Sequence, residues 1–266
     1  MLRESASLQW GRDAPRPQAE SGSMSVATVY TKSFFDLQLR FASAVAALPG
    51  MSLPHALLDY TNLYVRFGIG RAFDAAHPVW RDYLAGVERG GDLADWTWAF
   101  YRTRLPDEGP PAVVASSGCF SYARLGDDRI RLHFQNAEES GHSPLGAERR
   151  DQRLADLRAL FEEVGRREPR APSVVGASWL YNLPAYRRLF PQAYLATAVE
   201  VAPRFRNMPM WGQFLDRHGE LRPAVAEPFL RRVSEQVSLQ ALAGCFPFQV
   251  LALEAPVSVF QAFYRL

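Results

Sequence analysis

The sequence predicts an α/β (α+β) protein in which a helical N-terminal region packs on a mixed β-sheet. Three observations predict this class. Up to about residue 105, apolar residues recur at helical spacing between glycine and proline breaks. The pattern of residues 129–191 then predicts a strand, a polar glycine loop, an amphipathic helix, a second strand and a short helix. Hydrophobic residues make up 48% of the 266-residue chain, which is ample for a sizeable core.

The first 111 residues divide into two predicted parts. Residues 1–23 are polar and lack periodicity, so we expect a disordered extension, with Met24 as an alternative start. The region 24–111 is predicted to be helical, and its aromatic side chains are interpreted as core packing rather than as a ligand-stacking surface. Its four helices are expected over residues 33–48, 52–68, 78–87 and 93–105.

The region 112–266 is predicted to hold the sheet. Strands over 112–124 and 129–134 form a hairpin, and the apolar strand over 173–180 has the character of one covered on both faces. A helix with an apolar stripe over 154–164 lies between them. The remaining elements are expected as a short helix over 185–190, a strand over 194–201, a helical turn over 211–215, a helix over 226–242, and one or two strands over 249–264.

The register of the predicted hairpin decides which side chains share a face. A turn at residues 127–128 places Tyr122 opposite His133 and points Cys119 away from His133. A shift of one residue reverses that conclusion. With the turn at residues 127–128, the apolar side of the second strand holds Ile130, Leu132 and Phe134.

Composition excludes several classes of function. The net charge is +2 and basic residues are spread along the chain, which gives no reason to expect a nucleic acid or a strongly acidic partner. Lys32 is the only lysine, and we interpret the preference for arginine as codon bias rather than function. Cys119 and Cys245 lie far apart without metal-type spacing, so neither a metal site nor a disulfide is expected. Without an apolar segment of membrane length or a signal sequence, we expect a cytoplasmic protein without a membrane partner.

The glycine loop after the second strand is the predicted binding element. A polar loop that enters a helix directs backbone N–H groups toward whatever lies there, and the helix N-terminus favours an anion. An ordinary surface loop is the alternative interpretation, because the spacing matches no nucleotide-binding fingerprint. The predicted anion-binding residues are Ser140, Gly141, His142, Ser143 and Gly146 of the loop, with Arg149 and Arg150 in the first turn of the helix.

His133 is the predicted general base. It ends a strand on the less apolar side, close in sequence to Asn136 and Glu138, and a histidine can exchange protons near neutral pH. A structural histidine is the alternative. A nucleophilic pair of Cys119 and His133 is disfavoured by the predicted register.

The order of strand, loop, long helix, strand, asparagine, short helix and strand resembles the C-terminal half of the GNAT acyltransferase fold. The similar pieces are residues 132–133, 144–145 and 178–180, and the resemblance covers residues 112–202. It implies that loop 140–146 cradles the pyrophosphate of an acyl-CoA and that Asn182 opens the short helix. It also implies that Tyr186 acts as the acid that protonates the departing thiolate.

Two functions follow as hypotheses. The first is transfer of an acyl group from a CoA or carrier thioester to a small amine or hydroxyl acceptor, with His133, or a water held by Glu138, taking the acceptor's proton and acyl-CoA as the only cofactor. The alternative is a non-catalytic small-molecule-binding or interaction protein that retains the fold, because the loop lacks the glycine spacing of the family. Thiol-dependent hydrolysis through Cys119 is a third hypothesis. The sequence does not indicate an oligomeric state.

Overall fold

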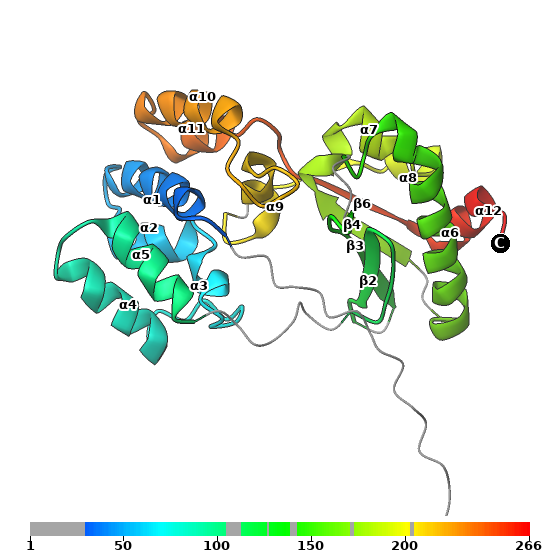
Figure 1. The fold of residues 1–266 in the computed structure, drawn as a ribbon, viewed down its shortest axis with the longest axis horizontal. Coiled ribbons are helices and arrows are strands. Elements are labelled where there is room, and N and C mark those ends of the chain that lie inside the picture. Colours follow the sequence, from blue (N-terminus) through cyan, green and yellow to red (C-terminus); the bar gives the residue numbers. More distant parts are fainter. Residues whose placement is uncertain (1–29, 105–112, 127, 139–142, 171–172, 203–204) are drawn as a thin grey trace, which may run out of the picture.

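The computed structural model describes residues 30–104, 113–126, 128–138, 143–170, 173–202 and 205–266. The predicted extension 1–23 and the loop residues Ser140, Gly141 and His142 lie outside the described residues. Two hydrophobic cores organise the described part of the chain. One lies among helices and the other lies between the sheet and its covering helices, and the two form neighbouring lobes (Figure 1).

The helical lobe begins with five helices, of which the first, fourth and fifth match the predicted ones closely. The predicted helix over 52–68 is two helices, because side chains take over the backbone hydrogen bonds at the break. Thr61 Oγ1 donates to the Leu57 carbonyl, and Gln38 Oε1 accepts from the Asn62 N–H at 2.9 Å. The helices are α1 (Lys32–Ala46), α2 (Leu53–Asp59), α3 (Leu63–Arg66), α4 (Pro78–Glu88) and α5 (Leu93–Arg102).

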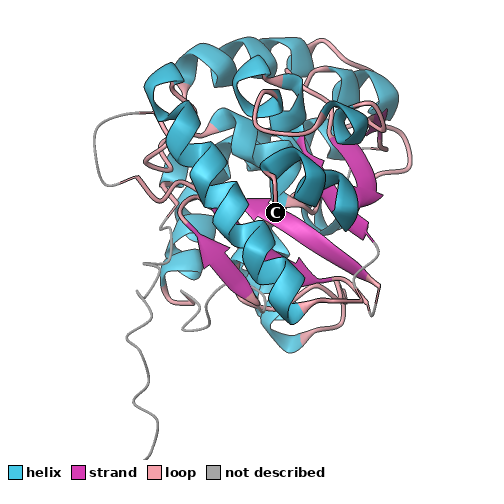
Figure 2. Cartoon of the chain, turned by 90° about the vertical axis from the view of Figure 1, so that its right-hand side faces the viewer, coloured by secondary structure: helices cyan, strands magenta, loops and turns pink. Residues whose placement is uncertain are grey.

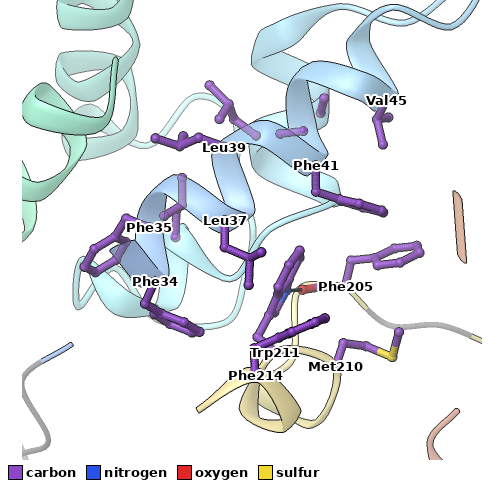
Figure 3. Close-up of a cluster of buried hydrophobic side chains, with 14 of the residues drawn as sticks. Phe34, Phe35, Leu37, Leu39, Phe41, Val45, Phe205, Met210, Trp211 and Phe214 are labelled. Atoms are coloured by element: carbon purple, nitrogen blue, oxygen red, sulfur yellow. Dashed lines mark hydrogen bonds between the residues drawn. The ribbon is translucent and has the colours of Figure 1, made fainter. Parts of the chain in front are cut away.

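A segment from the C-terminal half of the chain completes this lobe. The ring of Phe41 on α1 contacts Phe205, Trp211, Phe229 and Phe246, all of which come from residues 205–250. Figure 3 shows Phe41 beside Phe205 and Trp211. The helical core therefore includes residues that the sequence assigned to the α/β region. Its later elements are α9 (Met208–Trp211), η3 (Gly212–Phe214), α10 (Pro223–Ser234) and α11 (Leu239–Gly244), so the single helix predicted over 226–242 is two.

The second lobe is a mixed six-stranded sheet in the order β1-β2-β3-β4-β6-β5. β3 and β4 are parallel and the other neighbours are antiparallel. The strands are β1 (Ala115–Ser117), β2 (Phe120–Arg124), β3 (Arg129–Phe134), β4 (Ser173–Ser178), β5 (Val199–Glu200) and β6 (Leu251–Pro256). The predicted mixed α/β architecture with a helical N-terminal region is therefore confirmed.

Helices cover one face of this sheet and form the second core with it. The crossover between β3 and β4 runs through η1 (Ala147–Arg149) and α6 (Arg150–Arg167), and α6 packs against β1, β2 and α12 (Val257–Tyr264). Figure 2 shows helices lying in front of the sheet. Side chains on the opposite face of β4, such as Val175 and Ala177, line a cavity. Since Val175 is half-buried and Ala177 is exposed, the prediction that this strand is buried on both faces is wrong.

The hairpin register differs by one residue from the predicted one. Ser121, not Tyr122, lies opposite His133, and Tyr122 lies opposite Leu132 on the buried side. The physical reason is the connection, which closes with a bond from the Leu125 N–H to the Arg129 carbonyl at 2.8 Å and so leaves three residues in the loop instead of two. The predicted apolar side of β3 is confirmed, because Ile130 and Leu132 are buried and Phe134 packs against the same core.

Four other strand or helix predictions are wrong in their extent. The strand predicted over 112–124 is the β1–β2 hairpin, which turns at Gly118 with a positive φ of 52°. The strand predicted to reach residue 180 ends at Ser178, where η2 (Trp179–Asn182) and α7 (Pro184–Arg187) begin. The strand predicted over 194–201 is α8 (Gln192–Leu195) followed by the short β5. Beyond Pro256 the chain is helical, because the apolar residues there recur at helical spacing.

Candidate functional site

The centre of the candidate site is the point where β3 and β4 separate. The two strands pair only through residues 129–131 and 173–175. Farther along, residues 132–134 still pair with β2 and residues 176–178 still pair with β6. β3 and β4 therefore diverge toward their C-terminal ends, and the sheet opens between them.

A cavity of about 860 Å³ lies at this opening, and we call it the inter-strand cavity. Both lobes contribute to its walls. The sheet lobe supplies the end of β3, the loop before η1 and the β4–η2 junction, and the helical lobe supplies α9 and the turn before α10. The main lining segments are residues 132–136, 143–145, 177–181 and 215–219.

A second cavity of about 540 Å³ lies between the open face of the sheet and the helical lobe. We call it the arginine cavity, because five arginines line it: Arg66, Arg71, Arg129, Arg131 and Arg206. The two cavities share lining residues, and so they meet at the mouth of the opening between the strands. The shared residues are Leu132, His133, Ala177, Met208 and Pro209.

His133 is the titratable side chain that both cavities share among the described residues. Burial lowers the pKa of its imidazole below the usual value of 6.5, and the positive charges of Arg131 and Arg71 lower it further. The imidazole is therefore neutral at neutral pH, which is the form that accepts a proton. Its place and its ionisation both suit the predicted role of general base.

Glu138 is engaged elsewhere. Its carboxylate accepts a hydrogen bond from Arg153 Nη2 at 2.7 Å and lies 3.5 Å from Arg149 Nη2. The ion pair ties the chain after β3 to α6. Glu138 lines neither cavity, and its position disfavours the predicted role of holding a catalytic water.

Tyr186 belongs to an aromatic cluster in the sheet core. Its ring packs edge-on against Tyr181 and Phe134, and its side chain is only 3% exposed, although it borders the inter-strand cavity. Burial raises the pKa of its phenol well above the usual value of 10. A phenol with so high a pKa is a poor proton donor to a thiolate, which disfavours the predicted acid role.

The described part of the glycine loop borders the inter-strand cavity through Ser143. Arg188 Nη2 on the α7 side donates to the Gly146 carbonyl at 2.8 Å and to the Leu145 carbonyl at 3.1 Å, which fixes the end of the loop. Arg149 points toward Glu138 as described, and the exposed Arg150 pairs with its neighbour Asp151 at 3.9 Å. Neither arginine lines a cavity described above.

Basic residues of the other lobe take the place that sequence reasoning gave to Arg149 and Arg150. Arg217, His218 and Arg222 line the inter-strand cavity. Arg217 also joins the lobes, because its carbonyl accepts from the Asn136 side-chain amide at 2.8 Å. Sequence reasoning missed these residues, since the polar run before Gly219 indicates a turn but not its neighbours in space.

Asn182 does not cap the helix that follows it. Its side-chain amide donates to the Trp179 carbonyl at 2.8 Å and to the Gln249 carbonyl at 2.9 Å, and Leu183 occupies the N-cap position of α7. The predicted capping role is therefore wrong. Asn182 instead joins η2 to the chain that enters β6.

The two cysteines line neither cavity and so offer no nucleophile to this site. Cys119 is buried in the β1–β2 turn beside Arg153, and burial raises the pKa of its thiol. Ser121 occupies the position opposite His133. This arrangement disfavours a Cys119–His133 pair, because a buried thiol that resists ionisation is a weak nucleophile.

Two further searches cover the part of the chain that the structure describes. No group of three or more His, Cys, Asp or Glu side chains is placed there to hold a metal ion. No helix in the same residues has both the length and the apolar character needed to cross a membrane.

Comparison of the chain with protein-family models, with curated proteins and with solved structures returned no match. The class that the fold defines is a mixed α/β protein with a helical lobe. The function is therefore argued from the geometry of the two cavities.

Proposed function

We propose that the protein is an acyltransferase that moves an acyl group from a CoA or carrier thioester to a small amine or hydroxyl acceptor. The observation that carries the proposal is the divergence of β3 and β4 beside a cavity of about 860 Å³. The cavity borders the loop in which the resemblance to the GNAT fold implies donor binding. The proposal therefore treats the six-stranded sheet as GNAT-like.

The opening suits a long, thin donor such as the pantetheine arm of CoA. Two diverging strands leave backbone N–H and C=O groups that no longer pair with each other, and such groups favour a ligand that carries amides. Apolar side chains of Leu132 and Phe134 line the same cavity. Arg217 and Arg222 supply the positive charge that a diphosphate would bind.

His133 suits both proton transfers of the reaction because it faces both cavities. The neutral acceptor amine attacks the thioester carbonyl carbon, so that a C–N bond forms and the C–S bond breaks. The imidazole takes the proton from the amine nitrogen and returns it to the thiolate sulfur. The products are an amide and a free thiol, and no separate acid such as Tyr186 is needed.

Calorimetry and thermal shift with acetyl-CoA and longer acyl-CoAs test this proposal. We expect the wild-type chain to bind at least one of them. The variant Ala177→Phe should abolish binding, because Ala177 is exposed toward both cavities and a benzyl group there fills the opening between the strands. The matched control is Ala193→Phe on α8, which is exposed and lines neither cavity. A folded wild-type protein that responds to no acyl-CoA contradicts the proposal.

A further inference from the structure

We infer that the arginine cavity binds the acceptor and that this acceptor is a small molecule bearing a carboxylate or a phosphate group. The inference rests on the proposed function and names the substrate class of the same site. Its basis is the charge, size and position of the cavity, none of which follows from the composition of the chain.

The lining of the arginine cavity is strongly positive. Five arginines line it, and Glu254 is the single carboxylate among the described lining residues. Two nearby carboxylates offset part of this charge, since Asp59 pairs with Arg206 and Asp128 lies 3.7 Å from Arg129. Among the described residues, arginines outnumber carboxylates even with both included, and an anion would balance the excess.

Within the part of the chain that the structure describes, Arg66 and Arg71 have no carboxylate partner. Arg66 donates to the Tyr30 hydroxyl at 3.0 Å and stacks over the ring of Tyr30, while its buried Nε lacks a partner in the described structure. Arg71 is exposed beside the cavity and close enough to His133 to depress the pKa of the imidazole. A guanidinium that lacks a carboxylate partner favours an anion, to which it donates two parallel hydrogen bonds.

The size of the cavity indicates a metabolite rather than a macromolecule. A volume of about 540 Å³ lies in the range of pockets that enclose small ligands. One wall is the sheet, through Val175, Ala177 and Ala252, and the other is the helical lobe, through Val65 and residues 206–209. The ligand would therefore be held between the two lobes.

The position of His133 gives the bound anion its orientation. Arg66, Arg71 and Arg206 come from the helical lobe, whereas His133 lies on β3 at the junction with the inter-strand cavity. An acceptor anchored by its anionic group on the helical side would present its amine or hydroxyl toward His133 and the thioester. Donor and acceptor then approach the imidazole from different cavities.

Titration of inorganic phosphate and of succinate into the CoA-free protein tests this inference. Binding is followed by the NMR shift of the His133 imidazole and by calorimetry. We expect at least one anion to bind, and the variants Arg71→Gln and Arg131→Gln each to weaken it by about tenfold or more. The matched control is Arg81→Gln, which changes the charge equally on the exposed surface of α4 and should leave anion binding unchanged. Preference for phosphate or for succinate identifies which anion the acceptor carries.

Two outcomes would overturn the inference. One is that neither anion binds, or that Arg71→Gln and Arg131→Gln bind as tightly as wild type. The other is that these variants lose acyl-CoA binding, which would assign the arginines to the donor. If acyl-CoA fails to bind wild type while anion binding depends on Arg71 and Arg131, the anion site stands and the acyltransferase proposal falls.

Discussion

His133 combines two properties that are each ordinary but are informative together. It lies at the junction of two cavities, and its surroundings keep the imidazole neutral. Burial disfavours the charged form, and two neighbouring guanidinium groups disfavour it further. The same arginines that would attract an anionic acceptor therefore also keep the proposed base ready to accept a proton.

Substitution of Arg71 by glutamine should raise the pKa of His133. Removing a positive neighbour makes the imidazolium less unfavourable, so the imidazole should titrate at a higher pH than in wild type, closer to 6.5. In a pH profile of acyl transfer, the acidic limb should move to higher pH in the same direction. NMR titration of the imidazole measures the pKa directly, with Arg81→Gln as the control of equal charge. An unchanged or lowered pKa in Arg71→Gln would contradict the structure around His133.

The sequence allowed His133 to be predicted but not its arginine neighbours. An alternating strand pattern with a histidine on the polar side is a local signal, and it can be read within one strand. The five cavity arginines occur between residues 66 and 206 and come together only because the helical lobe packs against the sheet. The sequence therefore indicates only dispersed charge, because it does not show which of these residues lie close together in the fold.

Gly176 in β4 is a position where the absence of a side chain is required. A Cβ atom there would overlap the hydroxyl groups of Tyr181 and Tyr194, which hydrogen-bond to each other at 2.8 Å beneath the strand. We expect Gly176→Ala to lower the free energy of unfolding by about 1–3 kcal/mol, because the core must move to accept the methyl group.

The matched control for this prediction is Gly165→Ala on α6. A Cβ atom at Gly165 meets its nearest neighbour, Gln261 Nε2, at an ordinary 3.6 Å. Alanine should stabilise this helix by about 0.5–1 kcal/mol. Urea unfolding of the two variants should therefore move the midpoint in opposite directions, and a stabilised Gly176→Ala variant would refute the packing described beneath β4.

Helices whose ends are marked by residues at those ends were predicted well. Elements whose type or extent depends on contacts with residues far away in the sequence were not. α4 and α5 have clear boundary residues, such as Pro78 at the start of α4 and the Asp92 cap of α5. α12 was mistaken for a strand, because its short apolar run fits either period until the helix is seen to bury Val257, Phe260 and Tyr264. The divergence of β3 and β4 could not be predicted, since it depends on which neighbours each strand keeps.

At the scale of the whole molecule, the two lobes are not two consecutive pieces of chain. The helical core combines the first five helices with residues 205–250, and the sheet core combines residues 113–200 with the C-terminal strand and helix. Both cavities lie between the lobes. The proposed site therefore depends on a contact that neither lobe provides alone.

A fragment of residues 113–266 should express as an aggregated or poorly folded chain. It keeps buried aromatic residues of the helical lobe, such as Trp211 and Phe229, but lacks α1, against which they pack. Exposed apolar patches of this kind favour aggregation. Size-exclusion chromatography and circular dichroism measure the outcome, and a monomeric, cooperatively folded fragment would contradict the shared core.

The matched control also removes the segment of residues 203–248, which has lost its packing partner α1 in the longer fragment. Val199 and Glu200 of β5 pair with Ala252 and Leu251 of β6, so a short turn can replace residues 203–248 and join adjacent chain ends. We expect this shortened fragment to be more soluble than 113–266. The comparison separates loss of the helical lobe from damage to the sheet.

The segment between Glu200 and Leu251, which runs through the helical lobe, also has a consequence for how the protein folds. β6 lies between β4 and β5, so the sheet cannot be completed until the chain has travelled through the other lobe and returned. Closing a flexible loop of this length costs about 3–4 kcal/mol of chain entropy. If α9, α10 and α11 assemble on α1 before the sheet closes, the distance that remains to be searched is shorter. A substitution near Phe41 would therefore slow completion of a sheet through the connectivity of the chain rather than through direct contact.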